Sequence, residues 1–193
     1  MPGDYAGTIV RDGWVVYNSY KLASHQSCIA HLVRRCHEMI TDLPAWARST
    51  PRQVSDLLAE ALDARDLDKS GRAAVVIDIG ERLDLLFDQA HPHDANRRLI
   101  KHLRHERAAL FTFLTTAGVD ATNWRGEQGV RPAVVNRKVW GGNRTDRGAE
   151  TQGRVMTFLR TAHQQGADAV ALLVDLARAP NPGVVAGLTL RPG

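Results

Sequence analysis

Apolar residues recur three or four positions apart over most of the chain. In residues 28–43 this spacing predicts an amphipathic helix with one buried face. The same pattern predicts further helices at residues 50–71, 73–90, 94–118, 147–166 and 167–180. Thr50 is expected to cap the first of these further helices, with Pro51 at its first helical position. We therefore expect a mostly α-helical fold.

Two segments fit the helical pattern less well. The start of residues 73–90, AAVVID, could form a strand, but the apolar spacing continues to Phe87 and favours a helix. Residues 7–14, GTIVRDGW, carry β-branched side chains between two glycines and predict a short strand that ends at Asp12. Because one strand cannot form a sheet, we expect its neighbours to come from another chain or from outside this sequence. Residues 121–146 are expected to form a basic loop and residues 181–193 a loose tail.

The composition favours a globular protein with an anionic partner. The 193 residues suffice for one sizeable domain, or for one domain with an appendage. The net charge of +4 points to nucleic acid first and to a membrane surface only as a distant second. The charge is uneven, because residues 52–88 hold nine acidic and five basic side chains. The basic excess lies mainly in residues 97–107 and 125–160, which indicates a localised basic surface.

The sequence shows neither a targeting signal nor a membrane span. The N-terminus has no charged and apolar leader pattern, and no apolar run reaches the roughly 20 residues of a membrane span. We therefore expect a cytoplasmic protein without a membrane segment.

Cys28, His31, Cys36 and His37 do not predict a zinc site, since four ligands from one helix cannot surround a metal. Both cysteines are expected to be small buried residues. The remaining histidines of the helical region are expected in a solvated loop and on a basic helix face: His91, His93, His102 and His105.

Asp12 and Glu127 are the candidate catalytic groups. Taken alone, Asp12 is best explained as a turn residue, and Glu127 as a surface residue paired with Arg131. Taken together and beside a basic segment, two carboxylates on separate elements have the chemistry of two-metal phosphoryl transfer. Cationic side chains would then hold the phosphate backbone of a nucleic acid.

Several spaced motifs resemble one family over almost the whole chain. In order, these are RDGWVVY, SHQSCIAHLVRR, RRLIKHLRHERAALFTFL, ATNWRGEQGVRPAVVNRKVWGGNRTDRGAETQ and RVMTFLRTAHQQGADAV. They resemble the C-terminal part of bacterial insertion-sequence transposases of the IS66 type, which belong to the DDE superfamily. The resemblance implies a mostly α chain that forms the C-terminal fragment of an RNase H-like α/β catalytic core with a long helical insertion.

The resemblance also implies an order of segments. Residues 1–27 would be a remnant of the RNase H-like core with the second catalytic Asp, and residues 28–115 the helical insertion. Residues 116–180 would return to the core with the catalytic Glu and basic helices, and residues 181–193 would be the tail.

The resemblance gives individual residues their expected roles. Asp12 matches the second catalytic Asp and Glu127 the final catalytic Glu, and the two would bind Mg²⁺, or Mn²⁺, in the complete enzyme. Cys28 and His31 match a Cys-x-x-His pair that packs or orients the catalytic helix, and Asn123 belongs to the motif around the Glu. Further matches lie in the GGN stretch: Gly141, Gly142 and Asn143.

The expected partner is DNA at the terminal repeats of a transposon. Plausible phosphate contacts are Arg131, Arg137, Lys138 and Arg144. Trp124 and Trp140 would stack on exposed bases or wedge against them, and for Trp140 ordinary packing is an equally open alternative.

The chain departs from the family pattern at several positions. Trp124, Gly126 and Gln128 replace the usual Asn, Ala and Arg, and the first catalytic Asp has no counterpart. Asp78 follows an apolar run and could be taken for it, but we assign Asp78 to a helix of the insertion. We therefore expect little or no transposition by this chain alone.

Alternatives from another class stay open. The chain could be a non-catalytic DNA-binding or accessory protein that regulates transposition, or a relic of a truncated reading frame. Its protein partners would be the missing N-terminal half, a full-length transposase or further copies of the chain. The expected location is the bacterial cytoplasm, at the nucleoid.

Overall fold

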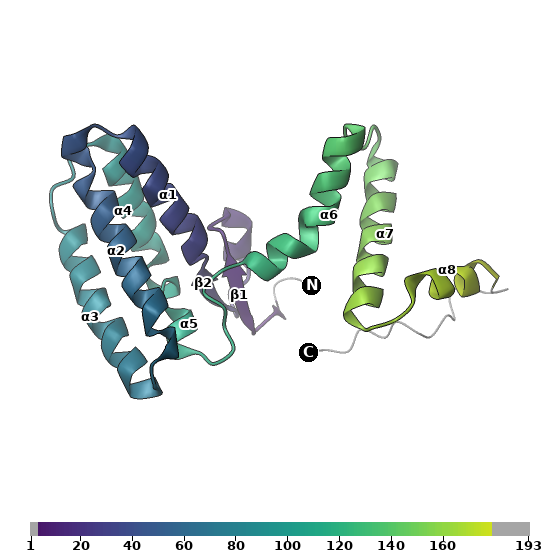
Figure 1. Ribbon diagram of the computed structural model, residues 1–193, viewed down its shortest axis with the longest axis horizontal. Helices are drawn as coiled ribbons and strands as arrows, with labels where there is room; N and C mark the ends of the chain where they lie inside the picture. The colour runs from purple at the N-terminus through teal and green to yellow at the C-terminus, as the bar shows by residue number, and fades with distance from the viewer. Residues whose placement is uncertain (1–3, 179–193) are drawn as a thin grey trace. The chain divides into compact units, whose positions relative to one another are not determined.

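The computed structural model describes residues 4–178 and divides the chain into two compact units. The first unit ends at Arg125 and the second begins at Gly126. Figure 1 shows the elements of both. The expected tail of residues 181–193 lies outside the described residues.

A two-stranded parallel sheet opens the first unit. Strand β1, Thr8–Arg11, pairs with β2, Ser24–Ser27, so that Arg11 lies opposite Ser27. A short 3₁₀ helix, Val15–Ser19, lies between the strands. The expectation of a single strand was therefore wrong. The segment SHQS of β2 has no β-branched residue and no Phe, Tyr or Trp, and its strand conformation depends on pairing with β1 and on the burial of its last two residues.

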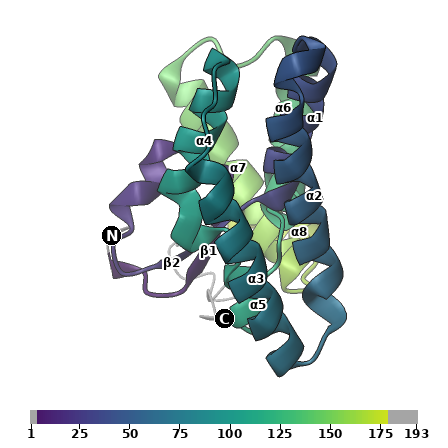
Figure 2. The ribbon, with the colours of Figure 1, turned by 90° about the vertical axis from the view of Figure 1, so that its left-hand side faces the viewer.

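Four long helices follow and lie side by side (Figures 1 and 2). They are α1, Ile29–Asp42; α2, Ser49–Asp63; α3, Lys69–Phe87; and α4, Asp94–Glu106. The short α5, Thr112–Thr115, packs against α3 and β2. Three 3₁₀ turns join these helices, at Ala45–Ala47, Ala64–Asp66 and Arg107–Ala109.

The helices form because their apolar residues repeat at helical spacing, and those residues build the core. Large, fully buried apolar side chains come from the four long helices and from the residue after the last 3₁₀ turn: Ile29, Val54, Leu58, Ile79, Leu83, Leu99, Leu103 and Leu110. Each contributes roughly 1.5–3 kcal/mol on burial. The helix predicted over AAVVID is confirmed, because these residues lie within α3. Asp68 caps this helix by accepting a hydrogen bond of 2.7 Å from the Gly71 N–H.

Three helix predictions were wrong in detail. The helix predicted over residues 50–71 ends at Asp63, and a 3₁₀ turn separates it from α3, which begins at Lys69. Residues 94–118 do not form one helix, because the chain leaves the helical path after Glu106. The buried amide of Gln26 explains the break: it donates to the Leu110 carbonyl at 3.0 Å and accepts from the Phe113 N–H at 2.8 Å. It thus satisfies backbone groups that a continuous helix would pair internally. Thr50 is not the cap of α2 but lies in its first turn, where its hydroxyl is 3.2 Å from His91 Nδ1.

The second unit contains three helices in its described part. They are α6, Trp124–Trp140, whose first two residues still belong to the first unit; α7, Asp146–Gln164; and α8, Ala169–Arg178. The expectation of a basic loop over residues 121–146 was wrong for most of its length. Gly126, Gly129 and Pro132 disfavour a helix, yet α6 runs through all three. The helices predicted for α7 and α8 are confirmed.

The second unit has little interior. Among its described side chains only Ala162 is buried. Several large apolar side chains on its helices are exposed: Val130, Val134, Val135, Val139, Trp140, Val155, Leu159, Val170, Leu173 and Val174. Over the described residues, no helix has the length and apolar character needed to cross a membrane.

Candidate functional site

Asp12 lies directly after β1, as the sequence predicted. Its side chain is exposed, and Oδ1 accepts a hydrogen bond of 3.1 Å from the Trp14 N–H. The turn requires Gly13, whose φ of 89° is disfavoured for residues with a side chain. The turn thus presents the Asp12 carboxylate at the C-terminal end of a parallel strand, which is where α/β sheets commonly place their ligand-binding residues.

A buried ion pair anchors the residue before Asp12. Arg11 Nη2 lies 2.8 Å from Glu106 Oε2, and only 6% and 2% of the two side chains are exposed. The Ser27 hydroxyl donates to the same carboxylate oxygen at 2.6 Å, and Arg11 Nε donates to His25 Nδ1 at 3.1 Å. The Cys28 N–H donates to the Arg11 carbonyl at 2.7 Å. The end of β1 is therefore held by β2, by the start of α1 and by the end of α4.

Our sequence reasoning missed this network. The signal was present, because Glu106 follows Leu99 and Leu103 on the apolar stripe of α4, at the spacing of a buried position. A carboxylate at such a position requires a charged or hydrogen-bonding partner. The sequence does not identify that partner, since Arg11 lies on a distant strand.

His102 of α4 lies against the turn that carries Asp12. A Cβ atom built on Gly13 would be 3.1 Å from His102 Cε1. Burial, and then the charge of Arg35, lower the pKa of His102 below its ordinary value of 6.5. The ring beside the turn is therefore held in its neutral form more strongly than a free histidine.

His91 and His93 lie in the loop before α4, as predicted, but both are half-buried instead of fully solvated. His91 lies between α3 and α4, where Nε2 is 2.9 Å from the Leu86 carbonyl oxygen and Nδ1 contacts Thr50. His93 caps α4 by accepting a hydrogen bond of 3.2 Å from the Ala95 N–H. Both rings therefore order the start of α4 instead of facing only water. His105 is exposed, as predicted.

Cys28 joins the start of α1 to the segment that leads into the Glu motif. Its Sγ accepts a hydrogen bond of 3.2 Å from the Asn123 N–H, and the Ile29 N–H donates to the Ala121 carbonyl at 2.9 Å. Cys28 is buried, and His31 lies one turn later on α1 and is half-buried. Cys28 thus connects the start of α1 to the backbone at Asn123.

The two thiols are free and buried, which confirms the expectation of small buried residues. Burial raises the pKa of Cys36 to about 12. The Cys36 thiol is therefore protonated at neutral pH, and a protonated thiol is a poor nucleophile and a poor metal ligand.

Glu127 lies in the first turn of α6 and is exposed. A carboxylate at this end of a helix interacts favourably with the helix dipole. Asp12 belongs to the first unit and Glu127 to the second. Trp124 opens α6 and is exposed, and the Arg125 guanidinium lies 6.0 Å from the centre of its ring.

The expected phosphate contacts are all exposed. Arg131, Arg137 and Lys138 belong to α6, and Arg144 lies in the loop before α7. Arg131 and Lys138 are two turns apart on one face of the helix, about 10 Å along its axis. Trp140 ends α6 with 57% of its surface exposed, so packing in a core does not explain it.

Arginines pair with several carboxylates of the acidic surface of the first unit. Arg82 Nη1 lies 2.8 Å from both Glu60 Oε2 and Asp78 Oδ2, and hydrogen bonds to these carboxylates raise its pKa. A hydrogen bond from Arg107 lowers the pKa of Asp84 on the same helix. Asp78 thus lies on α3 in an exposed ion pair, as expected for a helix residue of the bundle.

Comparison with known proteins identifies the family. The chain matches the family described as Transposase IS66 family over residues 1–151, which is more than half of its 193 residues. This range includes Asp12, Glu127 and all four expected phosphate contacts. No curated protein and no solved structure matched the chain. The chain belongs to the IS66 family of transposases.

Proposed function

We propose that this chain supplies Asp12 and Glu127 as metal-binding carboxylates to a DDE transposase that cuts and joins DNA at transposon ends. The observation that carries the proposal is the anchored carboxyl end of β1, which presents an exposed carboxylate in a chain of a transposase family. Glu127 adds a second exposed carboxylate within the matched range.

The two carboxylates fit Mg²⁺, or Mn²⁺, by their donor chemistry. Hard divalent cations prefer carboxylate oxygens, and Mg²⁺ is commonly bound by one or two carboxylates with the remaining positions filled by water and phosphate oxygens. The hydrogen bond from the Trp14 N–H orients the Asp12 carboxylate through Oδ1. A bound pair of such ions activates an attacking oxygen and stabilises the leaving one.

The sheet and bundle support a place in an RNase H-like core with a helical insertion. The parallel pairing of β1 with β2 is the pairing found in α/β folds, and α1–α5 share one hydrophobic core. Arg11 Nη1 is buried without a hydrogen-bond partner among the described residues. An orphaned donor of this kind is costly, and an acceptor from a neighbouring part of the core would satisfy it.

The basic residues of α6 and the following loop would hold DNA. Arg131, Arg137, Lys138 and Arg144 are exposed and lie between the Glu motif and α7. Contacts to phosphates position a protein on DNA without reading its sequence. The DNA partner would be the terminal repeats of a transposon, which places the proposed activity in the bacterial cytoplasm, at the nucleoid.

We further propose that these 193 residues alone do not perform strand transfer, because the family mechanism requires a third carboxylate with no counterpart among them. The test is a strand-transfer assay with Mg²⁺ or Mn²⁺ on DNA that carries the terminal repeats. We expect DNA binding without joining. Joining that survives Asp12→Asn and Glu127→Gln would overturn the assignment of both carboxylates. Joining that both variants abolish would overturn only the proposed inactivity.

An accessory role is the second candidate. It is favoured by the second unit, whose helices expose apolar side chains and bury only Ala162 among those described. Such surfaces mark protein interfaces. A full-length transposase of the same element, or a second copy of this chain, would cover them. In a mixed assay, inhibition of the full-length enzyme by this chain, unaffected by Glu127→Ala, would favour the accessory role over the catalytic one.

A further inference from the structure

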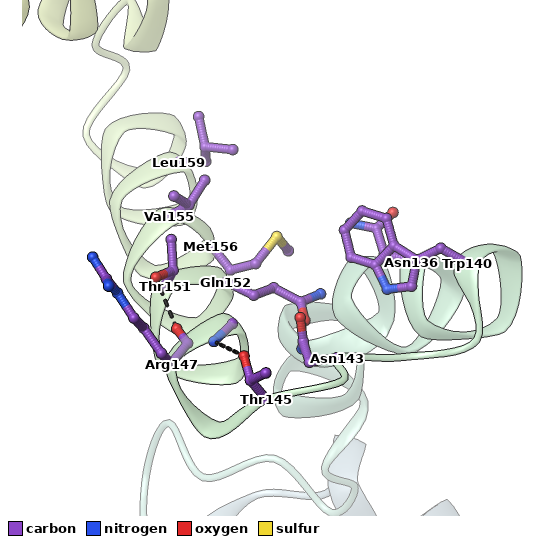
Figure 3. Close-up of a pocket in the computed structure, with 11 residues that line it drawn as sticks. Asn136, Trp140, Asn143, Thr145, Arg147, Thr151, Gln152, Val155, Met156 and Leu159 are labelled. Carbon is purple, nitrogen blue, oxygen red and sulfur yellow. Dashed lines mark hydrogen bonds between the residues drawn. The ribbon is translucent and has the colours of Figure 1, made fainter.

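The second unit contains an open groove of about 620 Å³ beside the end of α6 (Figure 3). It is formed by α6, by the loop of residues 141–145 and by α7 from Arg147 to Leu159. This volume is within the usual range for sites that hold one small organic group. Eleven residues line it, among them Asn136, Trp140, Asn143, Gln152 and Met156.

The groove has one flat aromatic wall and one aliphatic wall. Trp140 projects from α6, and Val155, Met156 and Leu159 line the side formed by α7. In Figure 3 the Met156 side chain points toward the indole. The two walls are therefore suited to a flat ring that stacks on Trp140 and contacts the thioether of Met156.

Amide groups lie next to the aromatic wall. The Asn143 side-chain amide donates a hydrogen bond to Gln152 Oε1, which connects the loop to α7. Asn136 lies on α6 beside Trp140. Asn and Gln amides carry both donors and acceptors, as the edges of nucleobases do. The groove can therefore hydrogen-bond a heteroaromatic ring as well as stack on it.

The charge around the groove favours an anion. None of the eleven lining residues is acidic. Arg147 lines the groove with its guanidinium directed away from Trp140, and Arg144 lies in the loop. The Arg137 side chain runs along the loop, since a Cβ built on Gly142 would be 3.3 Å from Arg137 Cγ. Phosphates on either side of a bound ring would meet Arg137 and Arg144.

We propose that this groove binds one unpaired nucleotide of a DNA strand, with its base stacked on Trp140 and its flanking phosphates held by Arg137 and Arg144. The proposal rests on the proposed function, because it names the part of the DNA that the transposase chain would contact here. A paired duplex hides the faces of its bases, so only an unpaired base can enter. Amide contacts from Asn136 and Gln152 would add a preference among bases.

The test measures DNA binding by the 193-residue chain with 2-aminopurine as the fluorescent base. One probe carries this base unpaired within a duplex, and a second carries it fully paired. We expect tighter binding of the unpaired probe, by about tenfold, together with a change in 2-aminopurine emission on stacking. Trp140→Ala should remove both effects, and Trp140→Phe should keep most of them because a phenyl ring still stacks.

Trp46→Ala is the matched control, since Trp46 is another exposed tryptophan, in the first unit, and should leave both effects intact. Circular dichroism of each variant checks that its helices are retained. Equal binding of both probes by the parent chain would overturn the groove proposal and leave DNA binding standing. A parent chain that binds neither probe would overturn the proposed function as well. A change of oligomeric state in Trp140→Ala, with DNA binding unchanged, would assign the groove to a protein partner and overturn the nucleotide proposal.

Discussion

Arg11 and Glu106 form an ion pair in the interior of the first unit, with Arg11 Nη2 2.8 Å from Glu106 Oε2. Arg11 ends the strand that carries Asp12, and Glu106 ends α4 of the helical bundle. The bundle thus holds the candidate catalytic strand through a charged contact as well as through apolar packing. The Ser27 hydroxyl of the neighbouring strand β2 donates a hydrogen bond to the same Glu106 carboxylate, so both strands contact it.

Glu106→Ala should destabilise the first unit strongly. It leaves the Arg11 guanidinium buried without its counter-charge, which typically costs about 3–5 kcal/mol. The free energy of unfolding, measured by urea titration followed by circular dichroism, should fall by that amount. Asp84→Ala is the control, because it breaks the exposed pair with Arg107 and should cost no more than about 1 kcal/mol. Equal losses in the two variants would contradict the buried network.

If Glu106→Ala does not fold, the double variant Arg11→Met, Glu106→Leu still tests the network. It removes both charges and replaces them with apolar groups, which is often neutral for stability. We expect it to be more stable than either single variant. A double variant no more stable than the single ones would show that the two residues do not act as a pair.

Two glycine substitutions should have opposite signs. Gly13→Ala forces a side chain onto a φ of 89° and against His102, so the free energy of unfolding should fall by about 1–2 kcal/mol or more. Gly153 lies within α7, and nothing is within 4 Å of a Cβ built there. Gly153→Ala should therefore raise the helicity and stability of α7 by about 0.5–1 kcal/mol. Thermal unfolding measures both effects, and two changes of the same sign would contradict the turn geometry.

The stability of the first unit should depend on His102 below neutral pH. Its folded-state pKa is lowered by burial, so the unfolded chain takes up this proton first as the pH falls. The contribution of the neutral ring is present above the unfolded pKa of about 6.5 and is lost as the pH falls through that value toward the folded pKa. His102→Gln should therefore lose less stability than the parent between about pH 7.5 and about pH 5.5. The measurement is urea unfolding at both pH values. If the free energy of unfolding fell by the same amount in His102→Gln as in the parent between the two pH values, His102 would not be the group responsible.

The salt dependence of DNA binding should show whether Arg144 contacts a DNA phosphate. If its guanidinium contacts one phosphate, Arg144→Ala should reduce the slope of log K against log salt by about 0.9. Fluorescence anisotropy with one duplex at several salt concentrations gives the slope. Arg82→Ala is the control, because Arg82 is engaged by Glu60 and Asp78 on the acidic surface. If Arg82→Ala reduced the slope of log K against log salt and Arg144→Ala did not, the DNA would bind at the surface that carries Arg82 and not at Arg144.

The helices of the first unit were largely predictable because their stability comes from apolar faces that the sequence displays. Ile29, Leu32 and Cys36 alone mark the buried face of α1. β2 was not predictable, since SHQS becomes a strand through pairing with β1 and through contacts of Gln26 and Ser27 with distant segments. The strand propensities of the individual residues do not encode such tertiary contacts.

The candidate site was predictable only in part. The Asp-Gly pair after a β-branched run indicated the exposed turn of Asp12, and the structure confirms that turn. The helix around Glu127 was missed, because Gly126, Gly129 and Pro132 outweigh the helical signal of their neighbours. The support of Arg11 by Glu106 depends on tertiary structure, which no local pattern encodes.

Mn²⁺ binding tests the central assignment of Asp12 and Glu127 most directly. Electron paramagnetic resonance measures free Mn²⁺ during titration of the 193-residue chain in the presence of terminal-repeat DNA. Asp12→Asn and Glu127→Gln should each weaken binding by about tenfold or more, that is by at least about 1.4 kcal/mol. Asp168→Asn, which alters an exposed carboxylate that caps α8, should bind Mn²⁺ as the parent does. Parent-like affinity in both Asp12→Asn and Glu127→Gln would contradict the assignment of these carboxylates as metal ligands.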